Sequence, residues 1–175
     1  MEDVLDPYEE SPDPEQPVVC SAEYPCQLVE EVRPPEPAQG PRPRRVDYKY
    51  RRNGTANLFL VVHPEAGGRH VQATDRRTKM DFAARMKAPA DEQFAAAKLI
   101  RVVLDNLNTH TPAALYEAFA PEEAGGTARK LGFHYTAKPG SWLDMAALER
   151  AALATQCPGR CIPDAASPRR KVDAW

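Results

Sequence analysis

The stretch that most constrains the fold is residues 100–112, with the sequence IRVVLDNLNTHTP. Its first five residues are mostly apolar, which is typical of a strand buried on both faces of a parallel sheet. The run stops at Asp105, and a polar turn follows before Thr111-Pro112 starts a helix. Open α/β sheets bind ligands at the carboxyl ends of such strands, so Asp105 is a candidate functional carboxylate. The alternative is that Asp105 only caps the next helix.

The order of elements around this strand predicts one α/β domain. We expect extended segments at residues 17–20, 27–29, 46–52, 55–64, 69–75, 100–105 and 133–136, and helices from residues 79, 91, 112, 121 and 142. An antiparallel hairpin that leads into a parallel strand fits a ribonuclease H-like mixed sheet flanked by helices. In that topology the first strand lies beside the strand that ends at Asp105, and the closing helix packs near both.

Charge is distributed unevenly along the chain. Residues 1–36 contain eleven acidic side chains and one base, whereas residues 37–175 contain 22 bases and 14 acids. A basic body suggests a polyanionic partner, although an ordinary solvated surface is the alternative. We expect an acidic linker or tail over residues 1–16, a folded domain over residues 17–160, and a short basic helix over residues 161–175.

Residues 33–52 combine prolines with bases. Five prolines within residues 33–45 exclude regular structure and predict a long loop, and Asn53-Gly54 after it predicts a tight turn. Bases interleaved with Tyr48 and Tyr50 are typical of surfaces that bind phosphates and stack bases. The alternative is a solvated basic loop. The candidate nucleic-acid contacts in this segment are Arg42, Arg44, Arg45, Lys49, Arg51 and Arg52.

Other patterns limit the class of protein. The chain has no apolar run long enough to span a membrane and does not start with a signal peptide, so we expect a cytoplasmic protein. Its four cysteines form two pairs, at 20/26 and 157/161, whose spacings do not match a structural zinc site. We interpret them as free thiols.

Three segments resemble bacterial insertion-sequence transposases of the mariner-like DDE superfamily: RRNGTANLFL, VVLDNLNTHTPAALYEAF and FHYTAKPGSWLDMA. The resemblance covers nearly the whole chain. It implies a domain that cuts and rejoins DNA with three carboxylates and two divalent ions, Mg²⁺ or Mn²⁺, which prefer hard oxygen ligands. It also adds Lys138, in the turn after the last strand, as a candidate contact with the DNA backbone.

Only one of the three acids that the resemblance implies is present. Asp105 matches the second acid and is the candidate catalytic and metal-binding residue. The first acid corresponds to Ala22 and the third to Ala147, so a methyl group replaces each carboxylate. Asp144 lies three residues before Ala147, on the same face of a helix that includes both, and is a possible stand-in. Glu23 is expected to point to the opposite face of the sheet from Ala22.

We therefore expect the catalytic domain of a DDE transposase that is inactive. We also expect it to be truncated at its N-terminus, because relatives carry a helix-turn-helix region there and residues 1–16 cannot enter a major groove. The alternative is a non-catalytic module that binds nucleic acid or dimerises, as a homodimer or with an intact transposase. A third hypothesis is an active nuclease that uses Asp105 with Asp144.

Overall fold

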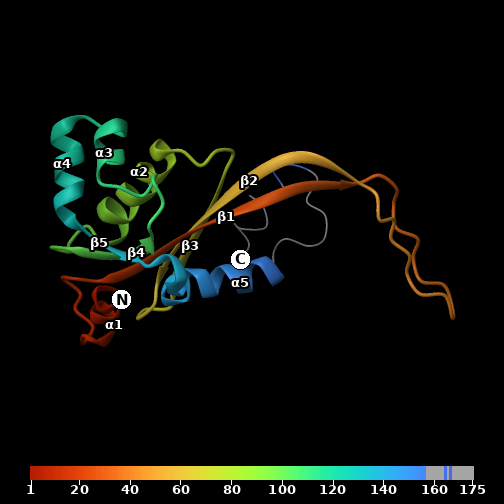
Figure 1. The fold of residues 1–175 in the computed structure, drawn as a ribbon, viewed down its shortest axis with the longest axis horizontal. Coiled ribbons are helices and arrows are strands. Elements are labelled where there is room, and N and C mark those ends of the chain that lie inside the picture. Colours follow the sequence, from red (N-terminus) through yellow and green to blue (C-terminus); the bar gives the residue numbers. More distant parts are fainter. Residues whose placement is uncertain (157–163, 165, 167–175) are drawn as a thin grey trace.

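A five-stranded mixed sheet forms the centre of the computed structural model, which describes residues 1–156, 164 and 166 (Figure 1). Its strand order is β3-β2-β1-β4-β5, with β2 antiparallel to β1 and β3, and with β4 parallel to β1 and β5. The strands are β1 (Val18–Glu31), β2 (Tyr50–His63), β3 (Gly68–Thr74), β4 (Ile100–Asp105) and β5 (Leu131–Thr136). This topology confirms the predicted α/β class and the ribonuclease H-like mixed sheet flanked by helices.

Helices cover both faces of the sheet and make three layers. One face packs against α2, α3 and α4, and the other against α1 and α5 (Figure 1). The helical elements are α1 (Glu2–Glu9), α2 (Lys79–Ala88), the π-helix η1 (Pro89–Gln93), α3 (Ala113–Ala118), α4 (Pro121–Lys130), the 3₁₀ segment η2 (Lys138–Leu143) and α5 (Met145–Gln156). None of the helices in the described part of the chain is long and apolar enough to cross a bilayer.

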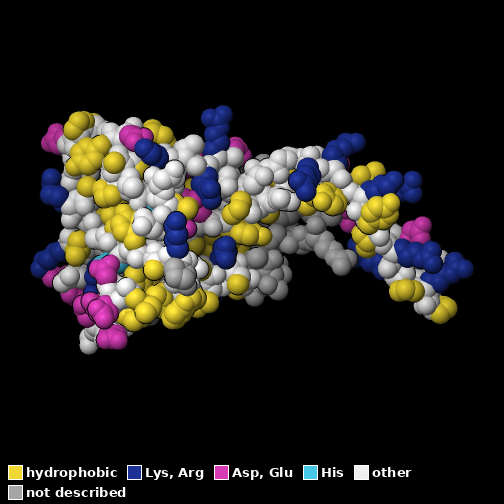
Figure 2. Space-filling view, viewed as in Figure 1, with side chains coloured by type: hydrophobic (Ala, Val, Ile, Leu, Met, Phe, Trp, Pro, Cys, Tyr) yellow, Lys and Arg dark blue, Asp and Glu magenta, His cyan; other side chains and the backbone are white. Residues whose placement is uncertain are grey.

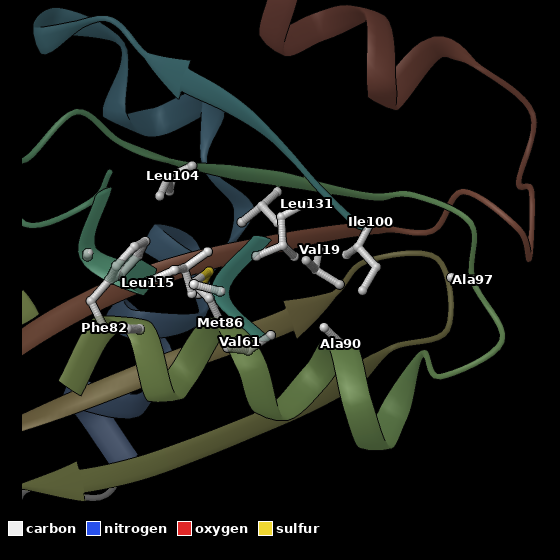
Figure 3. Packing of buried hydrophobic residues seen from close by; sticks show 14 residues of the cluster. Val19, Val61, Phe82, Met86, Ala90, Ala97, Ile100, Leu104, Leu115 and Leu131 are labelled. Carbon is white, nitrogen blue, oxygen red and sulfur yellow. The ribbon is translucent and has the colours of Figure 1, made fainter. Parts of the chain in front are cut away.

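Strand β4 is buried on both faces, as its apolar run predicts. Leu104 packs on the α2–α4 face with Phe82 and Leu115, and all three belong to the larger core cluster (Figure 3). Val103 points to the other face, where it packs in a second cluster that includes Ala146 of α5. Because successive side chains alternate between faces, Asp105 follows Val103 onto the α5 side.

Helix α2 begins where its capping signal predicts. The Thr78 hydroxyl accepts a hydrogen bond from the Asp81 backbone N–H at 3.2 Å, and the Asp81 carboxylate accepts one from the Thr78 backbone N–H at 2.8 Å. This reciprocal pair satisfies two amides that the first helical turn otherwise leaves open. It also fixes the path of the chain from β3 into α2.

The acidic N-terminal segment is folded, which corrects the prediction of a tail over residues 1–16. Val4 of α1 is 1% exposed and packs in the cluster beneath β1 and β4. Arg101 of β4 is buried beside the segment, and its guanidinium donates to the Glu10 carboxylate and to the Gln16 backbone oxygen. Acidic composition suggested solvation, but buried apolar positions and the Arg101 contacts hold this segment on the sheet.

The long strands β1 and β2 extend beyond the rest of the sheet as an arm (Figure 1). We define the arm as residues 27–55; its tip, residues 32–49, carries two isolated bridges, at Glu36–Arg45 and Gln39–Arg42. Asn53-Gly54 does not form the predicted hairpin turn. It lies within β2 at a β-bulge, where the pairing shifts between Gln27 and Val29, and Gly54 has a φ of +104°. An unpaired extra residue needs the same backbone freedom that a turn needs, which explains the misleading signal.

The C-terminal part differs from the prediction in where its helix starts. A continuous helix capped by Ser141 was expected, but residues 138–143 form η2, and α5 begins at Met145. The basic helix expected over residues 161–175 lies outside the described residues, apart from Asp164 and Ala166, as do Cys157 and Cys161. Cys20 and Cys26 are buried.

Candidate functional site

The parallel pairing of β1 with β4 brings Ala22 next to Asp105. The parallel pairing ends at Ser21 opposite Leu104, so Ala22 and Asp105 are the next residues on the two strands. Ala22 lies on the α5 face, where it packs in the cluster that contains Ala146. The first of the matched positions therefore faces the same space as Asp105, with a methyl group in place of a carboxylate.

Helix α5 supplies the third matched position, Ala147, and Asp144 just before it. Asp144 has extended backbone angles (φ −82°, ψ 108°) and stands outside the helix, which corrects the assumption that it shares a helical face with Ala147. Its Oδ1 accepts a hydrogen bond from the Ala146 backbone N–H at 3.0 Å. Asp commonly caps helices in this way, because its carboxylate satisfies an amide that the first turn leaves open.

Asp144 is also buried, at 3% exposure. Burial, together with a smaller contribution from the negative charge of Asp105, raises the pKa of its carboxyl to about 7, against a lowering by the Ala146 hydrogen bond. The influence of Asp105 shows that the two carboxyls lie near each other. Asp144 is nevertheless a poor stand-in for a metal ligand, because one oxygen is committed to the helix and ionisation is costly at this depth.

The His110 ring contacts two carboxylates, Glu23 on β1 and Asp105 at the end of β4. It is 1% exposed and stacks on Phe82, with ring centroids 4.6 Å apart. Nε2 lies 2.8 Å from Glu23 Oε1, and Nδ1 lies 2.6 Å from Asp105 Oδ1. Burial lowers the pKa of His110, but the hydrogen bonds and charges of Asp105 and Glu23 outweigh this and raise it to about 9. The ring is therefore an imidazolium at neutral pH.

Glu23 also forms an ion pair with Arg77, in the loop between β3 and α2. The Arg77 Nε lies 3.4 Å from Glu23 Oε2, and the Glu23 side chain is only 2% exposed. The sequence carries no signal for Arg77 as the partner of Glu23, whereas His110, five residues after Asp105, is a candidate to contact phosphate, to orient the loop or to cap the helix. The signal that locates Glu23 is the alternation along β1, which places it on the α2 face, opposite Ala22.

The residues at this edge do not fit a pair of divalent ions. No group of three or more His, Cys, Asp or Glu side chains within the described residues is arranged to hold a metal. Glu23 is bonded to His110 and paired with Arg77, and Asp144 caps α5. Two hard cations need several oxygen ligands and offsetting negative charge, and Asp105 by itself cannot supply them.

The predicted nucleic-acid contacts fall into two separate places. Arg42, Arg44, Arg45 and Lys49 are exposed at the tip of the arm, and Arg51 and Arg52 are exposed where β2 begins. In Figure 2, Lys and Arg side chains gather along the arm at the end far from the body, whereas Asp and Glu gather around α1. Lys138 instead lies two residues after Thr136, which pairs with Asp105, so it belongs to the edge around Asp105.

The Tyr8 hydroxyl of α1 contacts β1 and η2 on the face of the sheet that α1 and α5 cover. It donates to the Leu143 backbone oxygen at 3.0 Å and lies 3.0 Å from the Cys20 sulfur. Burial raises the pKa of Cys20 to about 12, so this cysteine is a thiol rather than a reactive thiolate. These contacts hold α1 against η2 and add no nucleophile to the site.

A comparison with protein-family models finds one family, described as the DDE superfamily endonuclease, which matches residues 17–164. The match runs from the residue before β1 past the end of α5 and so includes Ala22, Asp105 and Ala147. Neither the curated proteins nor the solved structures contain a match to the chain.

Proposed function

The chain belongs to the DDE superfamily of endonucleases, and we propose that it is a transposase-type domain of the mariner-like kind that binds DNA without cutting it. The observation that carries this proposal is the pair of alanines, Ala22 and Ala147, at the positions where such a domain carries its first and third acids. Asp105 is then the one carboxylate left from the set of three.

The chemistry of strand cleavage explains why one acid is insufficient. Divalent ions in this superfamily clamp the attacking and leaving oxygens of a phosphodiester, and carboxylates hold them against their mutual repulsion. In this chain the neighbouring acids have other partners: Glu23 bonds to the His110 imidazolium and Asp144 caps α5. The same commitments argue against an active nuclease built from Asp105 and Asp144.

The arm supports DNA as the partner. It carries the six predicted contact bases, all exposed, together with Tyr48 and Tyr50, which are 84% and 53% exposed. Arg52 lies over the Tyr50 ring, 5.9 Å from its centroid, so a base and an aromatic face are presented together. Exposed bases bind phosphates with little regard to sequence, and exposed rings can stack on nucleobases.

A second candidate function, a dimerising module, is favoured by exposed apolar side chains on the same arm. Val32 and Val46, at the tip of the arm with Tyr48, are 52% and 37% exposed. In this proposal the arm pairs with a second copy of the chain or with an intact transposase. Light scattering after gel filtration tests it: a monomer at all concentrations contradicts the homodimer.

Two measurements test the proposed function together. Supercoiled plasmid incubated with the chain and Mg²⁺ or Mn²⁺ is expected to stay intact, and a labelled duplex is expected to bind in fluorescence anisotropy. Metal-dependent nicking that Asp105→Asn abolishes would contradict the loss of cleavage. Absence of duplex binding at low salt would contradict the DNA-binding role.

A further inference from the structure

The loop between β3 and α2 reaches the same edge of the sheet as Asp105. Strand β3 runs in the same direction as β1, because both are antiparallel to β2. Its last residue, Thr74, pairs with Asn57, which on its other side pairs with Pro25, three residues beyond Ala22. The chain then passes Arg76 and Arg77 before Thr78 caps α2. The topology thus adds two bases to this edge.

Four side chains of alternating charge run along the edge: Arg77, Glu23, His110 and Asp105. The contacts between neighbours measure 3.4, 2.8 and 2.6 Å. The two middle side chains are buried, at 2% and 1% exposure, whereas each end is 44% exposed. An ion pair with a buried carboxylate, through its Nε, therefore places the Arg77 guanidinium at the surface and on the same edge as Asp105.

We propose that Arg77 binds a phosphate of the DNA backbone at this edge, beside Asp105, without a metal ion. The inference rests on the proposed function, that the chain binds DNA. A guanidinium held at Nε still has two terminal amino groups in a planar fork, which match the geometry of two phosphate oxygens. Glu23 acts as a positioning residue, because it orients the guanidinium and is itself held by His110.

The substitutions at the matched positions make this edge more favourable to an anion. Carboxylates at positions 22 and 147 would repel a phosphate unless divalent ions stood between them. With alanine at both positions that repulsion is absent, and Lys138 lies on the other side of Asp105 from Arg77, on the strand β5 side. Side-chain cations therefore replace the charge that metal ions supply in a cleaving enzyme.

The edge and the arm can contact one duplex. From Ala22 to Glu31 strand β1 is extended over nine residues, which at about 3.3 Å per residue spans roughly 30 Å. Phosphates along one strand are spaced by about 3.4 Å, so this length corresponds to about nine base pairs. A duplex laid along the arm can place one phosphate at Arg77 and others at the arm bases.

Fluorescence anisotropy of a labelled duplex in EDTA tests the inference. Arg77→Gln is expected to weaken binding about tenfold, and to reduce the slope of log affinity against log salt by about 0.9. Arg77→Lys keeps the charge and is expected to retain most of that slope. Arg129→Gln, an exposed base on α4 away from this edge, is the matched control and is expected to change neither quantity.

The possible results separate this inference from the proposed function. If the wild-type chain binds and arm substitutions weaken binding while Arg77→Gln behaves like Arg129→Gln, the Arg77 inference is wrong and the DNA-binding role stands. If the wild-type chain does not bind, both are wrong. Melting temperatures of all variants show whether each is folded. If Arg77→Gln does not fold, the binding of Arg77→Lys still tests whether the charge at this position contributes.

Discussion

His110 Nε2 lies 2.8 Å from Glu23 Oε1, and this contact links strand β1 to the loop that follows β4. The same ring reaches Asp105 with its other nitrogen, so one imidazolium holds two carboxylates that would otherwise repel each other. A buried cation with two acidic partners is a feature that organises the site without any metal. It also makes the stability of the fold depend on pH.

The first prediction concerns that pH dependence. The folded pKa of His110 is about 9 and its ordinary value is 6.5, so the folded state binds a proton more tightly than the unfolded state. The resulting stabilisation is present in full below pH 6.5 and is lost as the pH rises through about 9. The free energy of unfolding, measured by urea denaturation, is expected to fall by on the order of 3 kcal/mol across this window.

Two variants check the assignment to His110. His110→Gln is expected to unfold at lower urea throughout, and to lack the decline in stability above pH 6.5. His70→Gln, which replaces an exposed histidine on β3, keeps the wild-type profile. An unchanged decline in His110→Gln would assign the pH dependence to another group.

The second prediction concerns α1. Val4 is 1% exposed beneath the sheet, so Val4→Ala removes buried methyl groups and is expected to cost roughly 1–3 kcal/mol of unfolding free energy. Leu148→Ala, at a side chain that is 59% exposed on α5, is the control and is expected to cost much less. Equal midpoints for the two variants in chemical denaturation would mean that α1 does not stabilise the domain.

The sequence predicted the parts of the fold whose signals are local. The apolar run IRVVL specified a strand buried on both faces, and Thr78 specified the start of α2. The neighbourhood of Ala22 and Asp105 followed from the strand order, since parallel strands in this topology end at one edge. These features depend on side-chain spacing within a few residues or on a small set of known topologies.

The parts that were missed depend on contacts between distant segments. Residues 1–16 look solvated by composition, and only the burial of Val4 and the Glu10–Arg101 pair show that they fold onto the sheet. The contact between Arg77 and Glu23 joins residues 54 positions apart and has no local signature. Ser141 and Asp144 are both residues that commonly cap helices, and a cap at Ser141 would place Asp144 inside the helix. In the structure Asp144 is the cap, and tertiary packing makes the choice between the two.

The third prediction concerns the arm. If the six predicted contact bases of the arm, in residues 42–52, all contact phosphates, log affinity for duplex DNA falls against log salt with a slope of about −5. Replacing the six by glutamine is expected to remove most of that slope and to weaken binding at low salt. The matched control replaces six exposed acids outside the arm, Glu2, Glu65, Glu92, Glu117, Glu122 and Glu123, by glutamine. A control that weakens binding as much as the arm variant would contradict a specific role for the arm.

The last prediction restores the missing acids. Ala22→Asp with Ala147→Glu restores carboxylates at the two matched positions, on β1 and α5, and is expected to create a metal site with Asp105. The measurement is the melting temperature with and without Mn²⁺, because a ligand that binds only the folded state raises it. Each single substitution is expected to give a much smaller rise, since ligands of one ion act together.

A matched control distinguishes metal coordination by the two new carboxylates from the effect of their added charge. Ala66→Asp with Ala120→Glu adds the same two charges at exposed positions, in the β2–β3 turn and before α4, and is expected to show no response to Mn²⁺. Adding Asp105→Asn to the double variant is expected to abolish the response. Because carboxylates repel one another when no metal is bound, the double variant without Mn²⁺ is expected to melt below the wild-type chain. If it melts at the same temperature with and without Mn²⁺, positions 22 and 147 do not form a metal site with Asp105, and the explanation of lost cleavage by these two alanines is wrong.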